Sequence, residues 1–193
     1  MRHTIAILGA GVSGQAARQL AVSQGHTVCV FDQNGKGDRD VFTASIVETF
    51  DTVIVSPGFG SAHPWRQIAE QSSIPCFGEL GYAARFWKGK MIAITGTNGK
   101  STLTKFLAQA MSAAGQQAVA TGNIGYPLSA AVQSEVNTPD AFAILEVSSF
   151  QAEMPFGLEL DGLIWTNFAE DHLDRYESMA DYFAAKAKLF DCL

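Results

Sequence analysis

Residues 95–102 have the sequence Thr-Gly-Thr-Asn-Gly-Lys-Ser-Thr, and the organisation of the chain follows from this turn. The apolar residues 91–94 that precede it are typical of a buried strand in a parallel sheet. Residues 103–114, which follow it, lack Gly and Pro and carry apolar residues at helical spacing. A strand, a glycine-rich turn, a Lys-Ser-Thr sequence and a helix in this order are typical of a phosphate-binding loop.

This turn supplies the groups that hold a nucleoside triphosphate. Backbone N–H groups at a helix N-terminus point toward an anion, Lys100 adds positive charge, and a hydroxyl can reach Mg²⁺. The spacing is shorter than in the common P-loop, because Gly96 and Gly99 enclose two residues rather than four. We therefore expect an NTP site made by Gly96, Thr97, Asn98, Gly99, Lys100, Ser101 and Thr102.

A second glycine-rich turn lies near the N-terminus. We expect a strand over 4–8, then Gly9-x-Gly11-x-x-Gly14, a helix over 15–24, and a strand over 27–31 that ends at Asp32. This order matches the dinucleotide-binding fingerprint, in which glycines approach a phosphate and an acid binds a ribose hydroxyl. The pattern alone leaves the ligand open, so a turn without a ligand and an NAD-dependent oxidoreductase are alternatives.

The turn Ser56-Pro57-Gly58 follows a short apolar strand expected over 52–55. Ligands of open α/β sheets bind at the carboxyl ends of strands, so this turn is expected to open onto the same pocket as Gly9 to Gly14. The polar connector Lys88-Gly89-Lys90 is interpreted as a hinge. The predicted fold is α/β, with a Rossmann-like domain over 1–88 and a partial P-loop-type parallel-sheet ATPase domain over 89–193.

Polar residues follow three predicted strands of the second domain, which we expect over 91–94, 141–145 and 160–166. A parallel sheet brings these strand ends to one edge, beside the phosphate loop. Glu146 stands where a P-loop enzyme needs an acid that holds Mg²⁺, although an exposed strand-end carboxylate fits the position equally well. By pattern alone, His172 is typical of a surface or capping residue, and Lys186 is typical of a solvated helix lysine.

Composition restricts the class of protein. The 193 residues carry a net charge of -6, which argues against sequence-independent nucleic-acid binding because such binding needs a basic surface. Cys29, Cys76 and Cys192 lie far apart without C-x-x-C spacing, which is typical of a reducing compartment. The apolar run at 5–8 is too short for a signal peptide, and no stretch approaches a membrane span. We therefore expect a cytoplasmic α/β protein with no nucleic-acid partner.

Four motifs in this order resemble the Mur ligases of peptidoglycan synthesis. They are residues 95–102, Gly122-Asn123-Ile124-Gly125, residues 145–151 (Leu-Glu-Val-Ser-Ser-Phe-Gln) and residues 167–176, which end in Asp-His-Leu-Asp-Arg-Tyr. The shortened phosphate loop is the form that this family uses. Within the family, residues 9–14, the Ser56-Pro57-Gly58 turn and the Ser-Ser-Phe-Gln run are similar to the member that adds D-glutamate, with the alanine-adding member as the alternative.

The resemblance implies a fold, a reaction and a set of ligands. Such ligases have a UDP-sugar domain, a central ATPase domain and a C-terminal domain, so we expect the C-terminal domain and part of the central one to be missing here. The implied reaction joins D-glutamate to UDP-N-acetylmuramoyl-L-alanine through an acyl phosphate, with ATP and two Mg²⁺ sites. We expect the 193-residue chain to bind a uridine nucleotide without turnover; a non-catalytic UDP-sugar-binding module is a further alternative.

The resemblance also assigns roles to individual residues. The implied catalytic residues are Lys100, Asn123, His172 and Lys186. The implied metal ligands are Ser101, Glu146, His172 and Lys186. The implied substrate-binding residues are Val12, Ser13, Asp32, Gln33, Ser56, Gly58, Ser148 and Gln151. Gln33 departs from the hydroxyl residue of the family pattern. Lys186 aligns with a lysine that these enzymes carbamylate, with Lys188 as the alternative; carbamylation converts the cation into an anion, which suits a metal-rich site.

Overall fold

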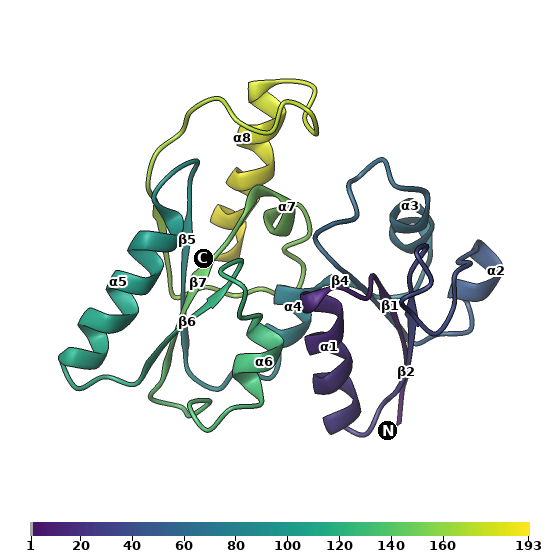
Figure 1. Ribbon diagram of the computed structural model, residues 1–193, viewed down its shortest axis with the longest axis horizontal. Coiled ribbons are helices and arrows are strands. Elements are labelled where there is room, and N and C mark those ends of the chain that lie inside the picture. Colours follow the sequence, from purple (N-terminus) through teal and green to yellow (C-terminus); the bar gives the residue numbers. More distant parts are fainter. Residues whose placement is uncertain (1) are drawn as a thin grey trace.

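Two four-stranded parallel sheets organise the protein in the computed structural model, which describes residues 2–193 (Figure 1). The first sheet has the order β2-β1-β3-β4 and the second the order β6-β7-β5-β8. The strands of the first sheet are β1 (Thr4–Leu8), β2 (Thr27–Phe31), β3 (Thr52–Val55) and β4 (Cys76–Gly78). Those of the second are β5 (Lys90–Thr95), β6 (Ala118–Gly122), β7 (Phe142–Glu146) and β8 (Gly162–Trp165). The predicted α/β fold class is confirmed.

Each helix that follows a strand of the first sheet has a glycine or a polar residue at its N-cap. They are α1 (Val12–Ser23), α2 (Ala44–Val47), α3 (Pro64–Gln71) and α4 (Glu79–Ala84). Helix α1 begins three residues earlier than the expected 15, because Gly11 is already its N-cap with an extended backbone. Gly14 therefore lies inside the helix, where a Cβ atom would stand 1.9 Å from the carbonyl oxygen of Gly9. The glycine lets α1 pack closely against the turn that leaves β1.

The second sheet places three strand ends side by side. Strand β5 lies between β7 and β8, and all three are parallel, so the polar residues after each strand meet at one edge as predicted. The helices here are α5 (Lys100–Ala113), α6 (Leu128–Val132), α7 (Ser149–Ala152) and α8 (Met179–Ala187), followed by the 3-10 helix η1 (Lys188–Cys192). In register, Glu146 of β7 pairs with Ile94 of β5 and with Gly122 of β6.

The C-terminal helix differs from the expected continuous helix over 178–193. The α-helix ends at Ala187, and the tighter η1 turn follows. This turn buries Leu189 completely and lets the carbonyl oxygen of Cys192 accept a 2.7 Å hydrogen bond from the Leu160 N–H group. Helices α2, α6 and α7 were not predicted, because four or five residues are too few to display helical periodicity.

One apolar core joins the two sheets. Helices α1, α4 and α6 lie between the sheets in Figure 1 and pack on one another. Leu20 of α1, Leu80 of α4 and Leu128 of α6 belong to the same buried cluster as Ile7 and Leu145 of the two sheets. No helix in the described part of the chain is long and apolar enough to cross a membrane.

Candidate active site

The phosphate loop follows β5 and turns into α5 through two left-handed glycines. Gly96 has φ +135°, and Gly99, the N-cap of α5, has φ +83°. A Cβ atom on Gly96 would lie 2.1 Å from the Thr166 hydroxyl oxygen, whereas one on Gly99 would meet open space. Both backbone angles favour glycine. At position 96 there is a second reason, because a side chain would collide with Thr166. Ser101 and Thr102 are exposed in the first turn of α5.

The segment after β8 holds this loop in place. The backbone N–H of Asn98 donates to the side-chain oxygen of Asn167 at 2.9 Å, and the Asn167 amide donates to the Asn98 carbonyl at 3.0 Å. The Thr97 hydroxyl donates to the Ala169 carbonyl at 3.1 Å and accepts from the Ala169 N–H at 3.0 Å. The loop is therefore pre-formed. Asn167 was not predicted as a site residue, although it follows the last predicted strand.

Two lysines converge on one carbonyl of the loop. Lys100 Nζ donates to the carbonyl oxygens of Gly96 and Thr97, at 3.0 and 2.7 Å. Lys186 Nζ reaches the same Gly96 oxygen from α8 at 2.9 Å, and its side chain is 1% exposed. Burial, and then the charge of Lys100, lower the pKa of Lys186 from 10.5 to about 8. The alternative residue, Lys188, instead donates to the backbone oxygen of Glu153 at 2.9 Å.

Glu146 closes the site at the end of β7. The side chain is 2% exposed, and its Oε1 accepts a 3.0 Å hydrogen bond from the Asn123 amide. Its Oε2 is buried and has no hydrogen-bond partner among residues 2–193. A buried carboxylate oxygen without a partner is costly, and a cation would satisfy it. Glu146 therefore fits a Mg²⁺ ion, with Asn123 holding the other oxygen.

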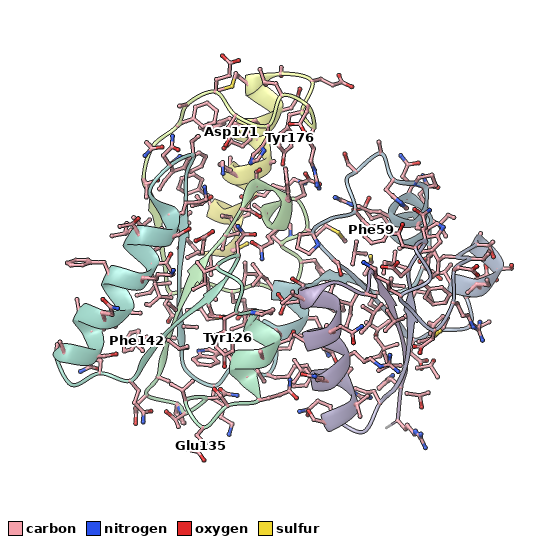
Figure 2. All side chains as sticks on the ribbon, in the orientation of Figure 1. Phe59, Tyr126, Glu135, Phe142, Asp171 and Tyr176 are labelled. Carbon is pink, nitrogen blue, oxygen red and sulfur yellow. The ribbon has the colours of Figure 1, made fainter. Side chains whose placement is uncertain are left out.

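His172 lies in the segment between β8 and α8. It is the non-glycine residue with positive φ, +56°, in the described chain, and its N–H donates to Asp171 Oδ1 at 2.9 Å. Its ring is 4.7 Å from that of Phe150, and its Nε2 is 3.5 Å from Asp171 Oδ2. Figure 2 shows Asp171 near Tyr176 beside α8. Within residues 2–193, no three His, Cys, Asp or Glu side chains gather around a point where a metal could bind. Hydroxyls, waters and phosphates would have to complete a Mg²⁺ shell.

A second site lies at the carboxyl edge of the first sheet. It is a cavity of about 470 Å³ that contains all the substrate-binding residues predicted for the first domain. The lining consists of Gly9, Gly11, Val12, Ser13, Asp32, Gln33, Asn34, Ser56, Pro57, Gly58, Phe59 and His63. Asn34, Phe59 and His63 were not predicted. The two predicted glycine-rich and serine-containing turns do share one pocket.

Asp32 and Gln33 have distinct roles in this cavity. The Asp32 carboxylate accepts hydrogen bonds from the N–H groups of Ala10 at 3.0 Å and Asn34 at 2.9 Å, and the first of these is the main reason that its pKa is lowered. Gln33 Oε1 lies 3.3 Å from His63 Nε2. The His63 ring packs edge-on against Phe59 with 4.5 Å between ring centroids. The cavity lining thus combines two aromatic rings with a carboxylate whose pKa is lowered.

The predicted substrate residues Ser148 and Gln151 lie outside this cavity, at the start of α7. They form a capping box. The Gln151 N–H donates to Ser148 Oγ at 3.2 Å, and the Ser148 N–H donates to Gln151 Oε1 at 3.1 Å. This arrangement orders the turn after Glu146.

The fold and the site define a class: a Rossmann-like sheet joined to a P-loop-type sheet, each with a glycine-rich turn at its carboxyl edge. A family model described as the Mur ligase middle domain matches residues 94–193. The chain belongs to the Mur ligase family.

Individual members of the family are similar to this chain over most of its length. The chain is 35% identical to a UDP-N-acetylmuramoylalanine–D-glutamate ligase of Leptospira interrogans serogroup Icterohaemorrhagiae serovar Lai, over 97% of this chain and 41% of that protein. It is 36% identical to the ligase of the same name from Aquifex aeolicus, over 96% of this chain and 43% of that protein. The chain thus spans about two fifths of the length of these relatives.

Solved structures agree on the fold. The UDP-N-acetylmuramate:L-alanyl-gamma-D-glutamyl-meso-diaminopimelate ligase from Neisseria meningitides superposes with a TM-score of 0.60 at 14% identity, over 100% of this chain and 69% of that one. The UDP-N-acetylmuramate-alanine ligase MurC from Thermotoga maritima gives a TM-score of 0.53 at 20% identity, over 99% of this chain and 47% of that one.

Proposed function

We propose that this chain is the UDP-sugar-binding part and a portion of the ATP-binding part of a ligase that joins D-glutamate to UDP-N-acetylmuramoyl-L-alanine. The observation that carries the proposal is the meeting of three features at one sheet edge: the phosphate loop, the unpaired oxygen of Glu146, and the buried Lys186. The names of the relatives at 35 and 36% identity support the choice of D-glutamate. We place the boundary between the two domains at 88/89, within the connector that separates the sheets.

ATP would bind along residues 96–102. Lys100 now donates to two loop carbonyls, and its ammonium would exchange these for the β and γ oxygens of the triphosphate. Ser101 lies exposed one residue further along α5, where its hydroxyl can face the same phosphates. Mg²⁺ bound by Ser101 and Glu146 would supply charge neutralisation, and His172 is proposed to serve a second Mg²⁺.

The uridine diphosphate would occupy the cavity of the first sheet. Its lining includes Gly11, Val12 and Ser13 at the N-terminus of the 12-residue helix α1, where backbone N–H groups suit a diphosphate. The Phe59 and His63 rings line the cavity, and an aromatic ring can stack on a pyrimidine. Asp32 and Gln33 offer acceptors for ribose or base N–H and O–H groups. Ser148 and Gln151 are proposed to contact the muramoyl end, through groups that the capping box leaves free.

The reaction proposed for the complete enzyme has two steps. The alanyl carboxylate attacks the γ-phosphorus of ATP, the bond to the β,γ-bridging oxygen breaks, and an acyl phosphate and ADP form. The amine of D-glutamate then attacks the acyl carbon, loses a proton, and phosphate leaves as the amide forms. Carboxylate and triphosphate repel each other, so the ammonium of Lys100 lowers the barrier by neutralising charge, and Asn123 orients the groups around Glu146.

Lys186 is the proposed site of carbamylation. Its amine would attack carbon dioxide, form an N–C bond and release a proton, which requires the neutral amine. A pKa of about 8 leaves about a tenth of the amine neutral at pH 7, far more than an ordinary lysine, and the amine lies 2.9 Å from the Gly96 carbonyl oxygen of the phosphate loop. The product is an anion whose nitrogen keeps a single N–H to donate to Gly96 O, and whose two carboxylate oxygens would attract a cation.

Calorimetric titration of this chain tests the proposal. We expect heat of binding with UDP-N-acetylmuramoyl-L-alanine, none with NAD, and no ligation on addition of ATP, Mg²⁺ and D-glutamate. Binding of NAD alone would contradict the assignment of the first cavity. Turnover by the isolated chain would show that the proposed inactivity is wrong. A Glu146→Gln variant that still binds ATP with the Mg²⁺ dependence of the wild type would remove Glu146 from the metal site.

A further inference from the structure

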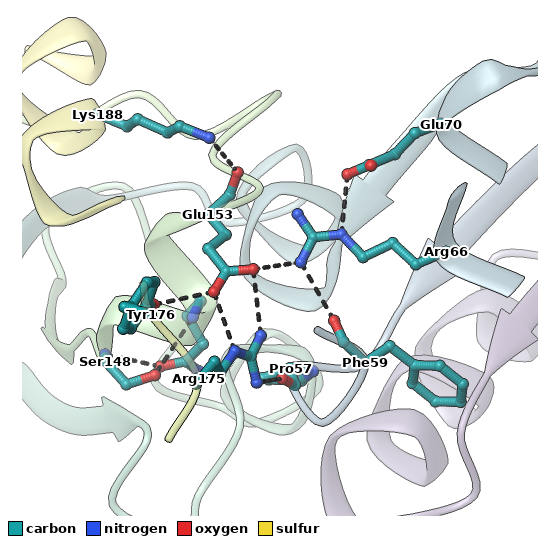
Figure 3. A network of polar contacts seen from close by, with 10 residues as sticks. Pro57, Phe59, Arg66, Glu70, Ser148, Glu153, Arg175, Tyr176 and Lys188 are labelled. Carbon is teal, nitrogen blue, oxygen red and sulfur yellow. Dashed lines mark hydrogen bonds and ion pairs between the residues drawn. The ribbon is translucent and has the colours of Figure 1, made fainter. Parts of the chain in front are cut away.

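Glu153 is a buried carboxylate at the junction of segments from both sheets (Figure 3). It follows α7, and its side chain is 7% exposed. Its two oxygens accept hydrogen bonds from Arg66 of α3, from Arg175 and from Tyr176. No proposed catalytic step uses it. Arg175 and Tyr176 belong to the motif at residues 167–176, whereas Glu153 and Arg66 were not singled out from the sequence. A buried carboxylate with this many hydrogen-bond partners fixes the positions of the side chains around it.

The first partner reaches Glu153 from the nucleotide-cavity side. Arg66 is 4% exposed; its Nη1 donates both to Glu153 Oε2 and, at 3.1 Å, to the carbonyl of Phe59. Its Nε donates to Glu70 at 2.9 Å, on the same helix and much nearer the solvent. Phe59 lines the first cavity. Arg66 therefore connects Glu153 to the cavity wall, whereas Glu70 adds only a local contact within α3.

The second partner reaches Glu153 from the segment that carries His172. Arg175 donates to both carboxylate oxygens of Glu153, each at 3.1 Å, and its Nη1 donates to the carbonyl of Pro57 at 3.2 Å. Its guanidinium also lies 3.8 Å from the ring centroid of Phe150. The Tyr176 hydroxyl donates to Glu153 Oε1 at 2.9 Å. A forked guanidinium can make these contacts at once, and they fix its orientation.

Charge favours this arrangement. Burial alone would raise the pKa of the Glu153 carboxyl, but hydrogen bonds from Arg175, Arg66 and Tyr176 together lower it, so the carboxylate is ionised at neutral pH. Removing it would leave two guanidinium groups facing each other at low exposure, which is costly. The Glu153 backbone oxygen also accepts a hydrogen bond from Lys188, two residues beyond Lys186. Glu153 thus contacts the His172 segment and the end of α8 directly, and reaches the cavity wall through Arg66.

We propose that Glu153 is a positioning residue that couples the nucleotide cavity of the first sheet to the His172 segment of the second. Through Arg66 and Arg175 it holds residues 57–59 against residues 172–176. A ligand that orders the cavity wall therefore also orders the His172 segment beside the phosphate loop. The identity of that ligand, a uridine nucleotide, rests on the proposed function; the coupling itself rests on the contacts of Glu153.

Hydrogen exchange followed by mass spectrometry tests the coupling first without any ligand. In Glu153→Gln, amides of residues 56–60 and 171–176 should exchange about fivefold or more faster than in the wild type, because both segments lose the same anchor. Glu70→Gln, which removes the other carboxylate partner of Arg66, should change neither segment by more than about twofold. Wild-type exchange in either segment of Glu153→Gln would overturn the proposal.

Arg175→Lys covers the case in which Glu153→Gln does not fold. Lysine keeps the charge but cannot bind Pro57 and both Glu153 oxygens together, so both segments should again exchange faster. Acceleration of 171–176 with unchanged 56–60 would show that Arg175 stabilises only its own segment and would reject the coupling.

Uridine diphosphate then separates coupling from a general loss of stability. In the wild type it should protect 56–60 directly, and 171–176 indirectly, since no residue of 171–176 is among the described residues that line the cavity. In Glu153→Gln, protection of 56–60 should persist at higher ligand concentration while protection of 171–176 disappears. Wild-type protection confined to 56–60 would reject the coupling. Protection of neither segment would reject the uridine site, and the ligand-free comparison would still decide the role of Glu153.

Discussion

The buried ammonium of Lys186 should make stability depend on pH in a way that a Lys186→Met variant lacks. The folded chain holds this group at 1% exposure, with a pKa lowered from 10.5 to about 8 by burial and by Lys100. That difference corresponds to a penalty of about 3 kcal/mol for keeping the ammonium buried at neutral pH. Methionine has a similar length and no charge, so it removes the penalty together with one hydrogen bond to Gly96, worth about 1 kcal/mol.

The direction of the effect follows from proton binding. Between about pH 8 and pH 10.5, the unfolded chain holds a proton on Lys186 that the folded chain has released, so the free energy of unfolding rises with pH. Lys186 does not destabilise the fold above pH 10.5, the pKa of the unfolded chain. The destabilisation grows as the pH falls and is complete below about pH 8, the pKa of the folded chain. The wild type should therefore gain about 2 to 3 kcal/mol relative to Lys186→Met between about pH 7 and pH 10.

Urea unfolding at a series of pH values measures this difference, with tryptophan fluorescence as the signal and buffers purged of carbon dioxide to keep the amine unmodified. Lys188→Met is the matched control, because it removes an exposed lysine only two residues further along the chain. Its stability should follow that of the wild type across the series. Parallel wild-type and Lys186→Met curves would refute the burial of a titrating amine at the phosphate loop.

Three further substitutions or treatments have defined outcomes. Gly96→Ala should destabilise the chain by about 2 kcal/mol or more and Gly99→Ala by about 1 kcal/mol, because only the former also collides with Thr166; thermal unfolding of the two variants compares them. The Cys76 thiol, whose pKa burial raises to about 12, should react with a thiol-specific reagent at pH 8 far more slowly in the folded chain than in urea, and equal rates would contradict its burial. Burial also raises the pKa of Glu79, so the wild type should lose stability as the pH rises above about 4.5, a loss that Glu79→Gln should abolish in acid-to-neutral unfolding series.

Much of the site could be predicted because its signals are local in sequence. The turns at residues 96–99 and 9–14 require glycine, either for a positive φ or because a side chain would collide with a neighbour. The spacing of these glycines in the sequence therefore predicts the turns. Strand direction then places Glu146 next to β5, because parallel strands end at one edge. The cavity residues from Val12 to Gly58 follow from the same rule.

The remaining features depend on pairs that are distant in the chain. Arg66 and Glu153 are separated by 87 positions, and Lys186 and Gly96 by 90, so no periodicity links them. Lys186 shares its helical pattern with solvated lysines, and only its packing between α8 and the phosphate loop shows that it is buried. Family resemblance assigns Lys186 to the metal site, whereas composition and pattern alone indicate a solvated lysine.

The shared core of α1, α4 and α6 has a consequence for recombination between relatives. A chimera that exchanged the first 88 residues would import α1 and α4 but keep the recipient's α6, and so would join two halves of one interior from different parents. Because interiors are filled at crystal-like density, mismatched side chains there leave voids or overlaps. A viable crossover would therefore carry residues 128–132 along with the first sheet, and the unit of exchange is larger than the unit that the sheets delimit.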